Sequence, residues 1–437
     1  MKRIIMFQGD IETQGYFSLQ MADALKKLGH EVFVYDLENP WKASSDMLRF
    51  FERGNTVVLS FNFHGMCQEV QFIDDERNTY IWDDLQIPCY NILADHPYYY
   101  YKLLAQRPRL YTQLSIDLGH EAFMKRFFPE VKMGPFLPLA GTQLVNAARD
   151  GHETGAFFRA PANMPALSGS LPDPDAPAHI VSPAQTGIPK RAGHLLPIAD
   201  RSMDVVFTGN YAAPSRFEKY ITRIDDEYTS FYYGIIDDLL DNPVQTVEDV
   251  VEKHLKREIT DISEEDLKVT MQSITFIDLY VRYHVRGRIV KALTDNGIKV
   301  NVFGDRWNEL RCEHPENLID GDSIYSVECL EKIADSKISL NVLPWFRRGP
   351  HDRIYNTFLQ KTVCVTDSNP WLDTYLKDKE NCAIYSLDQI EKLPFTVREL
   401  LKDNDKMQYI ADNGYILGCH NTWADRMKVF SDYLNDE

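Results

Sequence analysis

Residues 341–370 read NVLPWFRRGPHDRIYNTFLQKTVCVTDSNP and contain the pattern that most constrains the fold. The apolar run that ends near residue 343 predicts a buried strand, and a loop rich in Pro, Gly and Arg follows it. Residues 352–360 then predict a helix, and the β-branched run 362–366 predicts a second strand. Strand, loop, helix and strand in this order form the repeating unit of a parallel sheet. The stretch therefore predicts an α/β fold.

The loop between these two strands predicts an anion site. Ligands of parallel sheets bind beyond the carboxyl ends of the strands, where loops meet helix N-termini. Backbone N–H groups and cationic side chains stabilise a phosphate at such a place. The residues concerned are Arg347, Arg348, Gly349, His351 and Arg353. In the alternative interpretation the arginines belong to a solvated loop and Asp352 caps the helix.

The N-terminal part of the chain repeats the same alternation. Strands are predicted over 3–7, 31–35, 56–61, 88–93 and 110–116, with helices over 16–28 and near 121–128. The G-x-G-x-x-G glycines of dinucleotide-binding folds are absent, which disfavours an NAD-dependent oxidoreductase. We expect an N-terminal Rossmann-like domain over residues 1–146.

Polar side chains repeatedly follow the predicted strands of this first domain. They are candidates for catalysis, and each has an alternative role as a cap or a loop hydrogen-bond partner. The residues are Asp10, His64, Asp95, His96 and Asp117.

Composition changes over residues 147–200, which are rich in Pro, Ala, Gly and Ser and predict a flexible insertion or linker. A second α/β domain is expected over 201–418, with strands at 204–208 and 299–303. Between them, residues 215–296 predict a helical, acid-rich insertion, in which Arg282, Arg286 and Arg288 are expected to form a solvated face. A final helix near 423–434, within the segment 419–437, closes the chain.

Bulk properties limit the partners and the compartment. The 437-residue chain has a net charge of −18 and a pI near 5.1, which argues against nucleic acid or an anionic membrane as the main partner. The seven cysteines include no CxxC pair and predict buried free thiols in a reducing compartment. No signal-peptide core and no apolar run of membrane-spanning length are found, so a cytoplasmic protein is expected.

The second half resembles a known family. FTGNY at 207–211, VFGDRW at 302–307 and the stretch 337–372 are similar to GT-B glycosyltransferases related to the spore-maturation protein CgeB. The resemblance runs from about residue 204 to the C-terminus, with weaker matches at 87–97 and 136–140. It implies two Rossmann-like domains facing a cleft, with the C-terminal helix crossing back to the first. The first domain would bind an acceptor. The second would bind a nucleotide-diphosphate sugar, a UDP-sugar being favoured, without a metal.

The resemblance also assigns residues. Gly209 and Asn210 would lie in a glycine-containing loop near the donor, Arg306 and Trp307 near the nucleotide, and Tyr325 before the base-proximal helix. The diphosphate and ribose region would be covered by Arg348, Gly349, His351, Asp352, Arg353 and Asn356.

One departure from the family pattern concerns the reaction. Retaining GT-B enzymes often carry two glutamates eight positions apart in this loop, where this chain has Arg348 and Asn356. An amide cannot act as an ionised carboxylate, so retention of configuration is in doubt. Inversion requires a general base in the acceptor domain. Asp95 and His96 are favoured by position for this role, with His64 and Asp10 as further candidates.

These observations predict a cytoplasmic, metal-independent glycosyltransferase with an unidentified protein, glycan or small-molecule acceptor. Two alternatives stay open. One is a catalytically degenerate GT-B-shaped scaffold, suggested by the missing glutamates. The other is a sugar-nucleotide epimerase of the same shape.

Overall fold

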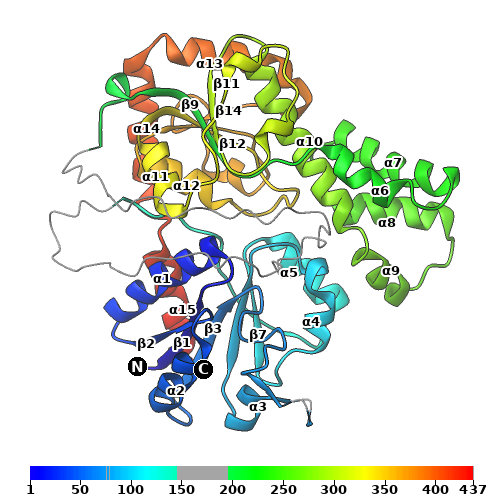
Figure 1. Cartoon of the computed structure of the whole chain (residues 1–437), viewed down its shortest axis with the longest axis vertical. Coiled ribbons are helices and arrows are strands. Elements are labelled where there is room, and N and C mark those ends of the chain that lie inside the picture. Colours follow the sequence, from blue (N-terminus) through cyan, green and yellow to red (C-terminus); the bar gives the residue numbers. More distant parts are fainter. Residues whose placement is uncertain (75, 78, 145–194, 437) are drawn as a thin grey trace.

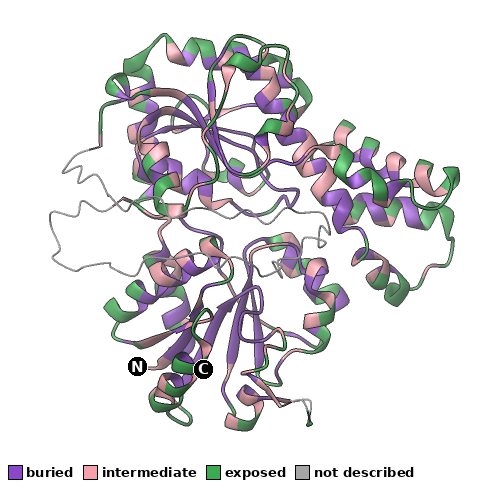
Figure 2. Cartoon of the chain, viewed as in Figure 1, coloured by how far each residue is buried: buried purple, intermediate pink, exposed green. Residues whose placement is uncertain are grey.

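The chain folds around two parallel sheets of six strands each (Figure 1). The structure, a computed structural model, describes residues 1–74, 76–77, 79–144 and 195–436. Of the predicted linker 147–200, residues 147–194 lie outside this described part. In Figure 2 the central strands of both sheets are buried, whereas exposed residues gather on the outer faces of the helices.

The first sheet has the strand order β2-β1-β3-β6-β7-β8. Every residue of β3, β6 and β7 is buried, which is the pattern of central strands covered on both faces. The strands are β1 Arg3–Gln8, β2 Glu31–Asp36, β3 Thr56–Phe61, β6 Cys89–Leu93, β7 Tyr111–Ser115 and β8 Lys132–Phe136, beside the small antiparallel pair β4 Ile73–Asp74 and β5 Thr79–Tyr80. The helices are α1 Glu12–Lys27, α2 Pro40–Phe50, α3 Ile81–Leu85, η1 Pro97–Tyr100, α4 Tyr101–Ala105 and α5 Leu118–Phe127.

The second sheet has the order β11-β10-β9-β12-β13-β14. Its strands are β9 Met203–Thr208, β10 Val300–Phe303, β11 Leu318–Asp320, β12 Ser336–Asn341, β13 Val363–Thr366 and β14 Ala383–Ile384. The covering helices are α11 Ser326–Ala334, α12 Asp352–Leu359, α13 Leu393–Leu401 and α14 Asn404–Gly418, with short 3-10 turns η2 Ile198–Asp200, η4 Trp307–Glu309, η5 Pro315–Asn317, η6 Leu372–Thr374 and η7 Leu387–Lys392. The unit predicted from residues 341–370 is β12, α12 and β13.

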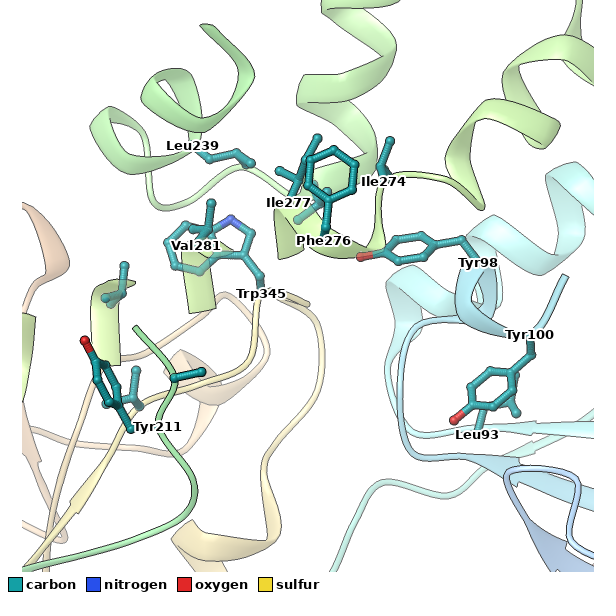
Figure 3. Packing of buried hydrophobic residues seen from close by; sticks show 14 of the residues in the cluster. Leu93, Tyr98, Tyr100, Tyr211, Leu239, Ile274, Phe276, Ile277, Val281 and Trp345 are labelled. Atoms are coloured by element: carbon teal, nitrogen blue, oxygen red, sulfur yellow. The ribbon is translucent and has the colours of Figure 1, made fainter. Parts of the chain in front are cut away.

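A helical insertion separates β9 from β10 and reaches the first domain (Figure 1). It consists of η3 Pro214–Phe217, α6 Glu218–Ile221, α7 Asp226–Asp241, α8 Val247–Glu258, α9 Glu264–Met271 and α10 Thr275–Thr294. In Figure 3, Tyr98 of the first domain points toward Ile274 and Phe276 of the insertion, and all three belong to one buried cluster. The insertion therefore shares a hydrophobic core with both domains.

The C-terminal helix α15, Trp423–Asp436, returns to the first domain and packs against α1. Trp423 lies 4.8 Å from Phe17 and 6.1 Å from Phe61 between ring centroids. His30 and Ser431 share a hydrogen bond of 2.8 Å. The predicted fold class, with its helical insertion and returning helix, is thus confirmed.

Two local predictions are wrong. Arg286 is buried at 9% exposure and the Arg282 side chain at 15%, so of the three arginines expected on a solvated face Arg288 alone is exposed. The cause is the packing of α10 between the second sheet and the first domain. The sequence 371–376 also predicts a helix, but the structure forms only the 3-10 turn Leu372–Thr374 there.

Candidate functional site

Two glycines bring the loops after β9 and β10 together. Gly209 and Gly304 both have φ of +147°, a region that favours glycine. A Cβ on Gly304 would lie 2.5 Å from the carbonyl oxygen of Gly209. The Asn210 side chain accepts a 3.0 Å hydrogen bond from the Asp305 backbone, which fixes the paired loops.

Two arginines converge beside these loops. Arg353 of α12 donates from Nε to the carbonyl of Thr208 at 2.7 Å and from Nη1 to Asn341 at 2.8 Å. Arg286 of α10 donates to the carbonyl of Asn210. Their guanidinium carbons lie 4.8 and 5.4 Å from the centroid of the same ring, Phe207. The sheet thus places two cations from distant helices at the carboxyl end of β9.

This pair lacks a carboxylate at ion-pair distance among the described residues. Burial lowers the pKa of the Arg286 guanidinium to about 9, and the positive charge of Arg353 acts in the same direction. Burial also lowers the pKa of Arg353. Buried cations without a counter-charge are costly, and an anion would offset that cost.

The N-terminus of α12 lies at the same edge. His351 is its N-cap and accepts a hydrogen bond from the Arg353 backbone at 3.3 Å. Asp352 lies 2.9 Å from His351. Burial alone would raise the Asp352 pKa, but His351 and Arg353 hold it below its ordinary value.

Three predicted donor residues make protein contacts instead. The Asn356 amide donates to Asp352 at 3.0 Å and accepts from the Thr142 backbone at 2.8 Å, which joins α12 to the segment after β8. Trp307 is fully buried and stacks on Tyr211, so it cannot cover a nucleotide base directly. Arg347 is buried in an ion pair with Asp367 at 3.1 Å, which leaves it a structural role.

Arg348 and Gly349 lie at the boundary with the first domain rather than beside Arg353. The Arg348 backbone donates to the Asp117 carboxylate at 2.6 Å. A Cβ on Gly349 would lie 2.4 Å from the carbonyl oxygen of Ile116. Asp117 itself caps α5, as the alternative interpretation of this residue expected. The loop before α12 is therefore a contact between the domains.

The remaining donor candidates are Tyr325 and Arg306. Tyr325 is exposed and is the N-cap residue of α11. The next residue, Ser326, donates to the carboxylate of Glu12 from the first domain at 3.0 and 2.8 Å. Arg306 follows β10 with a left-handed φ of 66°.

Asp95 and His96 are adjacent in the chain but have different surroundings. The Asp95 side chain is 30% exposed, lies 3.8 Å from Arg282 and accepts from the Tyr100 hydroxyl at 3.3 Å. Burial raises the Asp95 pKa, and positive charge on Arg282 and on His351 of the second domain opposes that rise. Asp95 thus lies beside Arg282 of the insertion, and the charge on His351 of the second domain affects its pKa.

His96, by contrast, is buried and points to the insertion, with Nε2 3.5 Å from Glu248. Burial lowers its pKa to about 3. A base with that pKa is poorly matched to neutral pH.

His64 lies 3.3 Å from Asp10, at the carboxyl ends of β3 and β1. The loops that carry this pair hold Gly9, Asp10, Asn62, Phe63 and Gly65 at positive φ. Such conformations persist only where the surroundings enforce them, and they gather at functional sites. The pair is a second acid–base candidate on the first domain.

Sequence analysis missed the polar residues of the insertion. Asp278, Arg282 and Arg286 recur every fourth residue on α10, which places them on one helix face. Asp278 accepts from Arg282 at 2.6 Å and from the Tyr99 hydroxyl at 2.7 Å. The four-residue spacing of these charged side chains was the available signal.

The lining of an open depression of about 760 Å³ includes Tyr211 and Arg311. It includes neither Arg286 nor Arg353. Among the described residues, no three His, Cys, Asp or Glu side chains are grouped to hold a metal ion. In the same part of the chain, every helix is too short or too polar to cross a membrane.

Comparison with known proteins gives a family match for part of the chain. Residues 286–432, from α10 to α15, match a protein family described as glycosyl transferase-like. No curated protein sequence matches the chain.

Three solved structures are similar in shape, each with a TM-score of 0.49. Sucrose-phosphate synthase from Thermosynechococcus elongatus is 9% identical, with 100% of this chain and 99% of that chain covered. An alpha-glucosyltransferase in complex with UDP and a DNA 13-mer is 10% identical, with coverage of 99% and 98%. T4 phage BGT, as a mutant in complex with UDP-glucose, is 8% identical, with 99% of each chain covered.

The family match over the second domain and the two Rossmann-like domains together support a glycosyltransferase of the GT-B type. The fold class that the resemblance implies is confirmed. The closer kinship with CgeB-related proteins stays a prediction.

Proposed function

We propose that the protein transfers a sugar from a nucleotide-diphosphate donor, with a UDP-sugar favoured, to an acceptor hydroxyl. The observation that carries the proposal is the pair Arg286 and Arg353, two buried guanidinium groups on one ring without a carboxylate partner among the described residues. A diphosphate supplies the missing counter-charge. The paired glycines let the loops after β9 and β10 lie together beside these two arginines.

The chemistry follows from this placement. As the bond from the anomeric carbon to the diphosphate oxygen breaks, negative charge grows on the leaving group. Fixed guanidinium groups and the N-terminus of α12 stabilise that charge without having to reorganise. We propose that two arginines suffice for this role without a metal ion.

Asp95 is the proposed general base. It would take the proton of the acceptor hydroxyl as that oxygen forms its bond to the anomeric carbon. Its position opposite His351 and its partial exposure support the assignment. The pair formed by His64 and Asp10 is the alternative base. Kinship with CgeB-related enzymes and a cytoplasmic location belong to the same proposal.

The test is calorimetric titration of the full chain with UDP, GDP, dTDP and CMP in EDTA, followed by the matching sugar conjugates. We expect one nucleoside diphosphate to bind without added metal, and its sugar conjugate to be turned over. Binding that appears only after Mg²⁺ or Mn²⁺ is added would overturn the proposed metal independence. Binding without turnover would favour a scaffold, and isomerisation of the donor without an acceptor would favour an epimerase.

A further inference from the structure

A cavity of about 140 Å³ lies where three parts of the molecule meet. The first domain contributes α5, the insertion contributes α8 and α9, and the second domain contributes the loop before α12. The lining includes Phe123, Arg126, Glu248, Glu252, Met271 and Arg348. None of these residues belongs to the donor pair described above.

Two charged groups in this lining have unused hydrogen-bonding capacity. The Oε2 atom of Glu248 is buried and lacks a hydrogen-bond partner in the described part of the chain. The Arg348 guanidinium is exposed and makes no hydrogen bond or ion pair within the same part. Arg126, by contrast, already binds Glu252 and Glu264 at 2.6 and 2.8 Å. The available groups are therefore one carboxyl and one guanidinium on the same cavity.

His96 lies beside the carboxyl group of Glu248. Its Nδ1 accepts the backbone N–H of Tyr98 at 3.3 Å, which assigns the ring proton to Nε2. That Nε2–H faces Glu248 Oε1 at 3.5 Å. No hydrogen bond forms across this distance, so the Nε2 atom of His96 and the Oε2 atom of Glu248 both lack a hydrogen-bond partner among the described residues. Behind His96, the ring of His120 is buried at 4.6 Å with both nitrogens unpartnered among the described residues.

The mixed charge of the lining selects the ligand chemistry. Glu248, Glu252 and Asp249 disfavour a strongly anionic ligand, and Arg126 and Arg348 disfavour a strongly cationic one. A neutral polyhydroxylated molecule suits both groups, because each hydroxyl donates to a carboxylate and accepts from a guanidinium. The volume lies below the roughly 300 to 1,000 Å³ of drug-sized pockets, so the cavity takes one small ring rather than an extended chain.

We infer that this cavity is the acceptor subsite and that it binds a neutral sugar ring, held by Glu248 and Arg348. The inference rests on the proposed function and adds the substrate class of the acceptor. Glu248 of the cavity lies 3.5 Å from His96, the residue that follows the proposed base Asp95 in the chain. Arg348 is thereby assigned to the acceptor rather than to the diphosphate.

Saturation-transfer NMR on the full chain tests this subsite with named probes. The neutral probes are D-glucose, D-galactose, D-mannose and N-acetyl-D-glucosamine, and the charged probes are glucose 6-phosphate and spermine. We expect at least one neutral sugar to bind. Glu248→Gln and Arg348→Ala should each weaken that binding about tenfold or more, the loss expected when a hydrogen bond to a charged group is removed.

Both variants should fold, because glutamine has the shape of the glutamate it replaces and the contact of Arg348 with Asp117 uses its main chain. Glu258→Gln, an exposed position at the end of α8, is the matched control and should bind like wild type. Binding of a neutral sugar that neither variant weakens would overturn the inference. So would binding confined to a charged probe, or the absence of any sugar binding.

UDP calorimetry on the same samples separates the two proposals. Unchanged UDP affinity in Arg348→Ala with lost sugar binding supports the acceptor subsite. UDP binding without sugar binding overturns the subsite alone, and sugar binding without UDP binding overturns the donor proposal alone.

Discussion

Arg286 and Arg353 lie against the same ring of Phe207, although α10 and α12 are far apart in the sequence of the second domain. Each guanidinium donates to a backbone carbonyl at the end of β9 or in the loop after it. This convergence, rather than the arginine-rich loop at 347–348, is the proposed anion site. The two arginines therefore give the most direct test of donor binding.

Arg286→Ala should lower the affinity for UDP by about tenfold to a hundredfold, since a charge-assisted hydrogen bond is worth about 1.5 to 3 kcal/mol. Calorimetry measures the change. Arg288→Ala is the matched control, because Arg288 lies two residues away on the same helix but is exposed. Equal affinities of the two variants would remove the diphosphate role from Arg286.

Asp95→Asn should lower kcat by about a hundredfold or more, the usual contribution of a positioned general base, and leave UDP affinity unchanged. A protonated carboxyl cannot accept a proton. Because the Asp95 pKa is raised, the wild-type rate should fall as pH drops through a value above the ordinary carboxyl range.

Steady-state rates across pH measure this acidic limb, and exposed Asp237→Asn is the control. If Asp95→Asn keeps full turnover and His64→Ala loses it, the base is the pair of His64 and Asp10.

Glu248→Gln should change how stability depends on pH. Burial raises the Glu248 pKa from 4.5 to about 7. Between pH 4.5 and about pH 7 the folded state holds a proton that the unfolded chain has released. The free energy of unfolding therefore falls as pH rises. The difference corresponds to about 3 kcal/mol at most. The variant should therefore be the more stable protein above neutral pH and match wild type in acid.

Urea unfolding at about pH 5 and about pH 8 measures this difference. Glu258→Gln, whose carboxylate is exposed, should follow wild type at both pH values. A stability difference for Glu248→Gln that is the same at both pH values would contradict the burial of its charge.

Trp423→Ala should destabilise the first domain by about 3 to 5 kcal/mol, because it removes a buried indole from the contact of α15 with α1. Chemical denaturation measures the loss. Trp41→Ala is the control, since Trp41 is 92% exposed. Similar stabilities of the two variants would mean that the contact of α15 with α1 contributes little to the stability of the protein.

Local sequence determined the elements of both sheets. The runs 56–61 and 204–208 became β3 and β9 because β-branched and aromatic residues suit buried parallel strands. The pattern at 341–370 became β12, α12 and β13. The paired loops were marked in advance by Gly209 and Gly304, since only glycine tolerates that backbone approach.

Tertiary structure decided which polar residues meet. Arg286, Asp278 and Glu248 lie on an insertion whose arginines sequence analysis expected on a solvated face, and their burial depends on packing against neighbouring elements. Asn356 and Trp307 lie at motif positions, but their side chains contact other residues of the protein. Periodicity reports which face of a helix is apolar, but the partners of a charged side chain come from elements distant in sequence. The sequence therefore determined the two domains and the location of the site, and packing decided its residues.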